Sequence, residues 1–114
     1  MEVESTRQQK IAKQIQRDIA DIFQKECREL FKGLLLTVTA VRVSPDFGYA
    51  KIYVSVFPFD RNEEVIALLK RENWAIRKSL GAKIKHQLKS VPEIDFFLDD
   101  SLEYIENIDK AINR

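Results

Sequence analysis

The sequence is poor in the residue types that build most catalytic and metal centres. It has one cysteine, Cys27, and one histidine, His86, which excludes an internal disulfide and a Cys/His zinc cluster. Its three glycines, Gly33, Gly48 and Gly81, lie too far apart to form a phosphate-binding loop. We therefore expect no metal, no cofactor and no enzyme activity, and Cys27 is interpreted as a small buried apolar residue.

Long apolar segments are also missing. No run approaches the roughly 18 residues of a membrane span. The polar opening MEVESTRQQK lacks the apolar stretch of a secretory signal. A hydrophobic fraction of 45% in 114 residues is typical of one folded domain with one core. We expect a single domain over 1–114, a cytoplasmic monomer with no membrane partner.

Charge is unevenly distributed, although the formal net charge is only +1. Segment 70–90 holds seven Lys or Arg residues and one acid, whereas segment 91–114 holds seven acids and two Lys or Arg residues. A cationic surface suits a polyanion such as nucleic acid. Solvated helix faces also carry lysines, so charge alone leaves both interpretations open.

The basic segment is predicted to form an amphipathic helix. Its apolar residues recur at every fourth position, namely Ile76, Leu80, Ile84 and Leu88. Lys78 precedes Lys85 and Lys89 by seven and eleven residues, which is near two and three helical turns. We expect these cations to share one exposed side as the main candidate nucleic-acid-binding patch, made of Arg77, Lys78, Lys85 and Lys89.

The first predicted helix offers a second basic surface. An apolar stripe of helical period runs through it, formed by Ile11, Ile15, Ile19, Ile22, Phe23 and Leu30. Cations lie mostly off this stripe. The alternative candidate set for nucleic-acid binding is therefore Lys10, Lys13 and Arg17.

Capping signals delimit the predicted helices. The first begins near Ser5 or Thr6, because each has a glutamine three residues later, and Gly33 is its expected end. Asp60 with a glutamate three residues later opens a second helix. Asn73 is the expected kink between this helix and the basic one.

Three strands are predicted, over 34–43, 49–57 and 93–98. Turn 44–48 joins the first two as a hairpin, and we expect Gly48 to adopt a backbone conformation that is costly for other residues. In the second strand the residues facing one way are all apolar, namely Ala50, Ile52, Val54 and Val56. Helices must cover that face, which predicts a two-layer α+β domain.

A last helix is predicted after Asp100 or Ser101. Its buried side is expected to be Leu102, Ile105, Ile108 and Ile112. The neighbouring acids Asp99 and Asp100 resemble a metal-binding pair, but adjacent acids before a serine favour a helix cap.

Several segments together resemble the ribosome-binding factor A family. They are TRQQKIAKQIQRDIADIFQKE, LTVTAVRVSPDFGYAKIYVSVF, IRKSLG and VPEIDFFLDDS. The resemblance covers nearly the whole chain and implies a KH-like type II domain, with order α-β-β-α-α-β plus a C-terminal helix. It also implies a non-catalytic bacterial factor that binds the 30S subunit and assists late 16S rRNA maturation and processing, chiefly in the cold. Other assembly factors are possible further partners.

The chain departs from the family pattern at two places. Glu72-Asn73-Trp74 stands where relatives usually carry an Ala-x-Gly kink, and the segment between Gly81 and Pro92 is longer. A GxxG loop, which ordinary KH domains use to clamp a nucleic-acid backbone, is absent, as the family resemblance also implies. Binding is then expected to rest on basic faces and shape, because phosphate contacts supply affinity without reading sequence.

Two other function classes compete with RNA binding. A protein-interaction adaptor would use an exposed sheet face or edge, with Tyr49, Tyr53 and Phe57 as contacts. These aromatic residues do not discriminate, because exposed rings also stack on bases. A small hydrolase is disfavoured, because the sequence offers no nucleophile–base pair.

Overall fold

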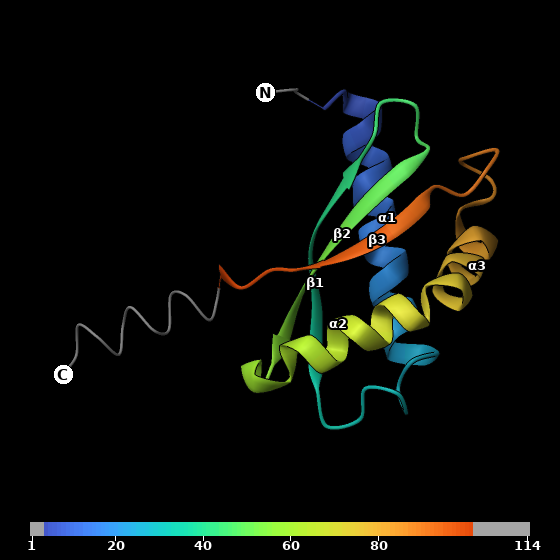
Figure 1. Cartoon of the computed structure of the whole chain (residues 1–114). Helices are drawn as coiled ribbons and strands as arrows, with labels where there is room; N and C mark the ends of the chain where they lie inside the picture. Colours follow the sequence, from blue (N-terminus) through green and yellow to red (C-terminus); the bar gives the residue numbers. More distant parts are fainter. Residues whose placement is uncertain (1–3, 102–114) are drawn as a thin grey trace.

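The computed structural model describes residues 4–101, and the statements below concern that part of the chain. Its elements are α1 (Thr6–Lys25), β1 (Leu35–Val43), β2 (Tyr49–Phe57), a 3-10 turn (Phe59–Arg61), α2 (Asn62–Arg71), α3 (Asn73–Ile84) and β3 (Glu93–Leu98). This order confirms the α+β class and the α-β-β-α-α-β arrangement of a KH-like domain (Figure 1). The helix expected after Ser101 lies outside the described residues.

The three strands form one mixed sheet in the order β1-β2-β3. β1 and β2 are antiparallel, whereas β2 and β3 are parallel. Val54 of β2 lies opposite Val38 of β1 and Leu98 of β3. Because side chains alternate along a strand, this register puts one apolar set on the same side of the sheet. The predicted alternation of β2 is confirmed.

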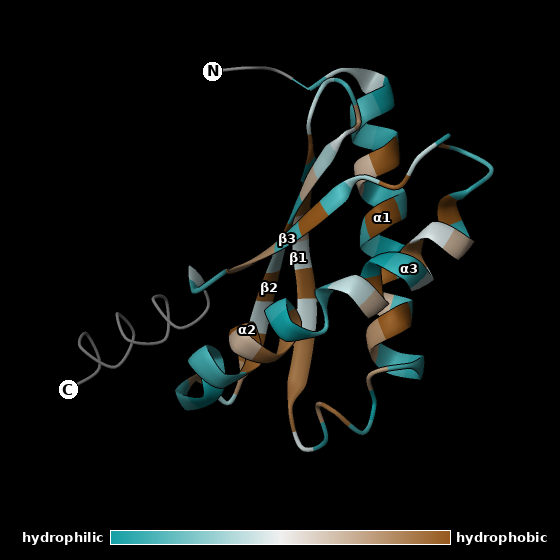
Figure 2. Ribbon diagram, turned by 45° about the vertical axis from the view of Figure 1, so that its right-hand side comes forward, coloured by the Kyte–Doolittle hydropathy of each residue, from teal (hydrophilic) through white to brown (hydrophobic). Residues whose placement is uncertain are grey.

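All three helices contribute side chains to a single core against that side of the sheet. Residues from α1, β2, α2 and α3 are almost inaccessible to solvent, including Ile15, Ile19, Ile52, Val54, Val65, Leu69, Leu80 and Ile84. Figure 2 shows hydrophobic and hydrophilic residues alternating along α1, and most of the hydrophobic ones are buried. The stripe of the basic helix and that of the first helix from Ile11 to Phe23 are therefore confirmed as core faces, and Cys27 is buried as expected. Leu30, predicted for the same stripe, lies in the turns after α1 and is half-buried.

The start of α1 is held by its own side chains. The backbone N–H of Gln8 donates to Ser5 Oγ at 3.1 Å, and the backbone N–H of Ser5 donates to Gln8 Oε1 at 2.9 Å. This reciprocal pair is the capping box predicted from Ser5, and it satisfies two N–H groups that the helix itself leaves unpaired.

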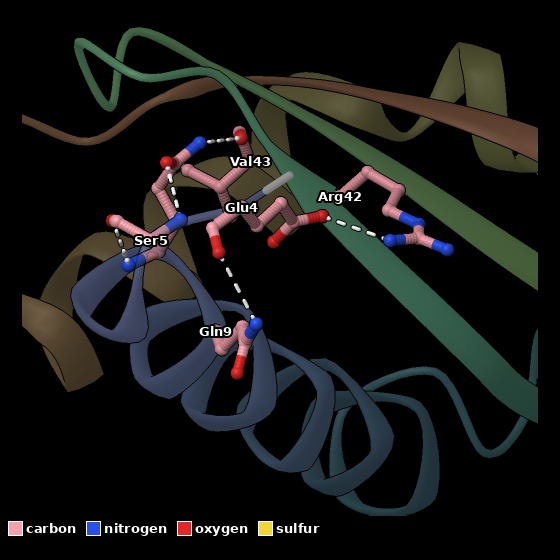
Figure 3. A network of polar contacts seen from close by, with 6 residues as sticks. Glu4, Ser5, Gln9, Arg42 and Val43 are labelled. Atoms are coloured by element: carbon pink, nitrogen blue, oxygen red, sulfur yellow. Dashed lines mark hydrogen bonds and ion pairs between the residues drawn. The ribbon is translucent and has the colours of Figure 1, made fainter. Parts of the chain in front are cut away.

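Two glutamines of α1 also bind the backbone of β1. Gln8 Nε2 donates to the carbonyl oxygen of Val43, and Gln16 Nε2 donates to that of Val38, each at 2.9 Å. Near the first of these contacts, Glu4 forms an ion pair with Arg42 at 3.1 Å (Figure 3). These polar contacts fix how α1 lies along β1, which in turn sets which side of α1 faces solvent.

Replacing Gln8 with alanine is expected to destabilise the domain by roughly 1–3 kcal/mol, because Val43 would lose a buried hydrogen-bond donor and the capping box would be broken. Urea denaturation measures this cost. The control is Gln9→Ala, which removes only an exposed hydrogen bond to the carbonyl of Glu4 and should change stability by less than about 0.5 kcal/mol. Equal effects of the two substitutions would contradict this role of Gln8.

Two expectations about glycine were wrong. α1 ends at Lys25, and turns follow over 26–33, so Gly33, with φ of 81°, ends these turns and not the helix. In the hairpin turn, the positive φ belongs to Phe47 (59°) and not to Gly48. The Asp46 carboxylate accepts the N–H of Gly48 at 3.0 Å, and a Cβ on Gly48 would lie only 3.2 Å from the same oxygen. Glycine thus fits this turn because it has no side chain that would crowd the Asp46 carboxylate.

The helix boundaries around α2 also differ from the prediction. Asp60 does not cap a helix, because a 3-10 turn intervenes and Arg61 occupies the N-cap position of α2 without a side-chain cap. The break between α2 and α3 falls at Glu72, one residue before the predicted kink. Asn73 begins α3, and its Nδ2 donates to the carbonyl oxygen of Ile94 at 2.9 Å. Asn73 therefore links the start of α3 to β3 through this hydrogen bond.

Candidate nucleic-acid interface

The predicted basic helix does not extend over all three lysines of the main patch. α3 ends at Ile84, so Lys85 caps the helix and Lys89 lies in the bend beyond it. The chain then returns to β3, which runs parallel to β2, and Leu88 remains buried in the core. Lys78, Lys85 and Lys89 are all exposed, but helical spacing no longer relates them.

Arg77 contacts the protein itself. Its Nε donates to the carbonyl oxygen of Pro92 at 3.0 Å, and its Nη2 donates to that of Val91 at 2.9 Å. Two hydrogen bonds from one half-buried guanidinium hold the α3–β3 loop against α3. Arg77 therefore stabilises the position of the loop that carries Lys85 and Lys89.

Lys78 is accompanied by an exposed aromatic ring that the sequence analysis did not select as a site residue. Its ammonium nitrogen lies 5.3 Å from the ring centroid of Trp74, and Trp74 is 72% exposed. A tryptophan four residues before a lysine on a helix was the available signal. An exposed ring beside a cation is an arrangement suited to stacking on a nucleobase.

The outer side of α1 presents the second predicted set. Lys10, Lys13 and Arg17 are all exposed. Within residues 4–101 none of the three forms an ion pair, and Arg17 makes one hydrogen bond, from Nη2 to Gln14 Oε1 at 3.0 Å. The structure therefore brings these three cations together on one rigid helix, available to an external anion.

Two other lysines, Lys25 and Lys83, form ion pairs within the protein. Lys83 of α3 lies 2.7 Å from a carboxylate oxygen of Asp21 on α1, and Lys25 lies 3.1 Å from the other. Hydrogen bonds from Lys83 and then Lys25 lower the pKa of the Asp21 carboxyl group. These contacts join α1 to α3 and neutralise part of the positive charge on that side of the domain.

The sheet face opposite the helices carries apolar and aromatic side chains. Tyr53 and Phe97 pack with ring centroids 5.6 Å apart, and the ammonium nitrogen of Lys51 lies 5.8 Å from the Phe97 centroid. Leu35 and Phe57, which lie opposite each other in the register, are 64% and 57% exposed. Of the aromatic residues predicted for this face, Phe57 is exposed, whereas Tyr49 and Tyr53 are half-buried, and the Tyr49 hydroxyl donates to Asp95 Oδ2 at 3.4 Å.

The described part of the chain shows no group of His, Cys, Asp and Glu side chains able to hold a metal ion. Asp99 Oδ1 accepts the N–H of Ser101 at 3.0 Å, and hydrogen bonds from Ser101 and then Thr39 lower the pKa of the Asp99 carboxyl group. Asp99 thus stabilises the turn after β3 by accepting the backbone N–H of Ser101. Across residues 4–101, no helix has the length and apolar character needed to cross a bilayer.

Comparison with known proteins decides the family. The family model of ribosome-binding factor A matches residues 7–112. The chain belongs to the ribosome-binding factor A family. Ribosome-binding factor A of Christiangramia forsetii is 43% identical over 110 residues, which span 96% of this chain and 84% of that protein.

Solved structures of ribosome-binding factor A share the fold. The crystal structure of ribosome-binding factor A from Thermus thermophilus gives a TM-score of 0.65 at 25% identity, covering 80% of this chain and 94% of that one. A homology model of the Thermus thermophilus protein, fitted into a cryo-EM map of a 30S–RbfA complex, gives 0.62 at 25% identity, with coverage of 78% and 91%.

Proposed function

We propose that this chain is a non-catalytic ribosome assembly factor that binds the 30S subunit and contacts 16S rRNA. The observation that carries the proposal is near full-length similarity to ribosome-binding factor A, one member of which has been fitted into a map of its 30S complex. By the same similarity we propose that it works in the cytoplasm as a monomer, in late 16S rRNA maturation, and matters most in the cold.

The proposed rRNA contacts are the exposed cations on two surfaces, Lys10, Lys13 and Arg17 of α1 together with Lys78, Lys85 and Lys89 around α3. Lysine and arginine supply affinity by neutralising phosphates and releasing counterions, which requires no GxxG loop and no base reading. Arg77 supports the second surface by fixing the loop that follows α3.

Co-sedimentation of the purified chain with 30S particles tests the proposal. Binding to rRNA should weaken steeply between low and moderate salt, because counterion release drives it. The adaptor alternative rests on the exposed Leu35 and Phe57 of the sheet face, and an apolar contact there should barely respond to salt. Failure to co-sediment at low salt would refute the assignment.

Trp74 provides a specific prediction for this interface. Trp74→Ala should leave the thermal stability nearly unchanged, because the ring is mostly in solvent. Its affinity for 30S particles should fall by about 1–3 kcal/mol if the ring stacks on a base. Trp74→Phe should retain part of the affinity. If Trp74→Ala binds like the parent protein, the ring does not contact rRNA.

A further inference from the structure

A groove lies between the C-terminal end of α1 with its following turn and the first half of α3. Its volume is about 540 Å³. The half-buried Leu30 and the exposed Ala75 present its accessible apolar surface, and the buried Ile22 and Ile76 form its floor. Such a concave apolar surface between two helices suits an aliphatic or aromatic side chain from a partner.

Every charged residue that lines this groove is an acid. Glu26 accepts a hydrogen bond from Ser79 Oγ at 2.6 Å, and Glu72 lies 3.4 Å from the exposed Arg71. Glu29 is exposed and forms no ion pair among residues 4–101. Burial, followed by the charges of Glu26 and Glu72, raises the pKa of the Cys27 thiol at the same place. The groove is thus a negative site on a protein whose proposed rRNA-binding surfaces are cationic.

We propose that this groove docks a protein segment rich in lysine and arginine that carries an apolar anchor. The anchor would enter the apolar groove, and flanking cations would face the three glutamates. Nucleic acid does not fit, because its phosphates would be repelled by the same glutamates. Proteins bound to RNA carry such cationic segments for phosphate contact, so a neighbour on a ribonucleoprotein particle has the required chemistry.

This proposal goes beyond the rRNA contacts and can be tested on the isolated chain. A peptide of alternating lysine and leucine is titrated into the isotopically labelled protein, and amide shifts are followed by NMR. Shifts should centre on 26–30 and 75–79. Peptides of alternating lysine and serine, or glutamate and leucine, should bind at least about tenfold more weakly, since each lacks one half of the complementarity.

Matched variants locate the binding. Ala75→Arg places a bulky cation in the groove and should weaken peptide binding at least about tenfold, whereas Ala82→Arg, at an exposed position of α3 outside the groove, should not. Glu29→Gln should weaken binding and reduce its salt dependence, with Glu63→Gln on α2 as the control. Circular dichroism confirms that each variant is folded.

The proposal would be overturned by amide shifts away from the groove, by unchanged binding by Ala75→Arg, or by equal binding of the lysine–serine peptide. Concentration-dependent shifts at the groove without peptide would instead make a second copy of the chain its occupant, and so also overturn it. Normal co-sedimentation with 30S particles alongside any of these results would leave the proposed rRNA contacts intact.

Discussion

Replacing Leu80 with alanine is expected to destabilise the domain by about 2–5 kcal/mol. Leu80 is fully inaccessible to solvent, and it lies on α3 in the core formed by helices and sheet. The substitution removes buried methyl groups and leaves a cavity that neighbouring side chains fill only partly. For a domain of this size, each kcal/mol lowers the melting temperature by about 4 °C, so the change should be large in a thermal scan.

The matched control is Leu35→Ala, which makes the same chemical change at a side chain that is 64% exposed. Its effect should stay within about 0.5 kcal/mol. The stripe of α3 would have to be reassigned to the surface if Leu80→Ala melted at the temperature of the parent protein.

The second large effect is expected for binding. Changing Lys10, Lys13 and Arg17 together to alanine should lower affinity for 30S particles and reduce the slope of log affinity against log salt. If each cation contacts one phosphate, the slope should shrink by roughly 2–3, at about 0.7–0.9 per contact. Stability should hardly change, because all three side chains are exposed and none forms an ion pair among the described residues.

The set Lys78, Lys85 and Lys89, changed to alanine in the same way, should also weaken binding, but by less. Its members do not share one helix side, because α3 ends at Ile84. A third variant serves as control, with the exposed residues Lys32, Lys51 and Lys70 changed to alanine. It removes the same charge from other parts of the surface. A loss of affinity equal in all three variants would mean that net charge, and not these surfaces, determines binding.

The secondary structure and core were largely predictable, because they depend on local periodicity. In β2 the alternation of apolar and other residues identified a buried face. The apolar residues at every fourth position from Ile76 to Leu88 identified another. The boundaries of the helices were less predictable. The stripe of apolar residues continues to Leu88, yet α3 ends at Ile84, so the local pattern did not show where the helix stops.

The candidate site was predictable in composition but not in geometry. A basic residue on a helix has the same pattern whether it faces solvent or the chain itself. Arg77 shows the difference, because its hydrogen bonds to the carbonyls of Val91 and Pro92 depend on a loop that returns close to α3. Similarly, the turn at Gly48 depends on the hydrogen bond from its N–H to the Asp46 carboxylate. The residue types predict a turn there, but they do not predict this contact.

The helices also determine how this sheet can meet other proteins. Adjacent peptide groups of an edge strand point alternately toward its neighbour and outward, and outward groups invite another strand to pair. On β1 the outward carbonyls of Val38 and Val43 are occupied by glutamines of α1. On β3 the outward carbonyl of Ile94 is occupied by Asn73. Among the described residues, both edges are therefore blocked at these three positions, which disfavours extension of the sheet into a polymer.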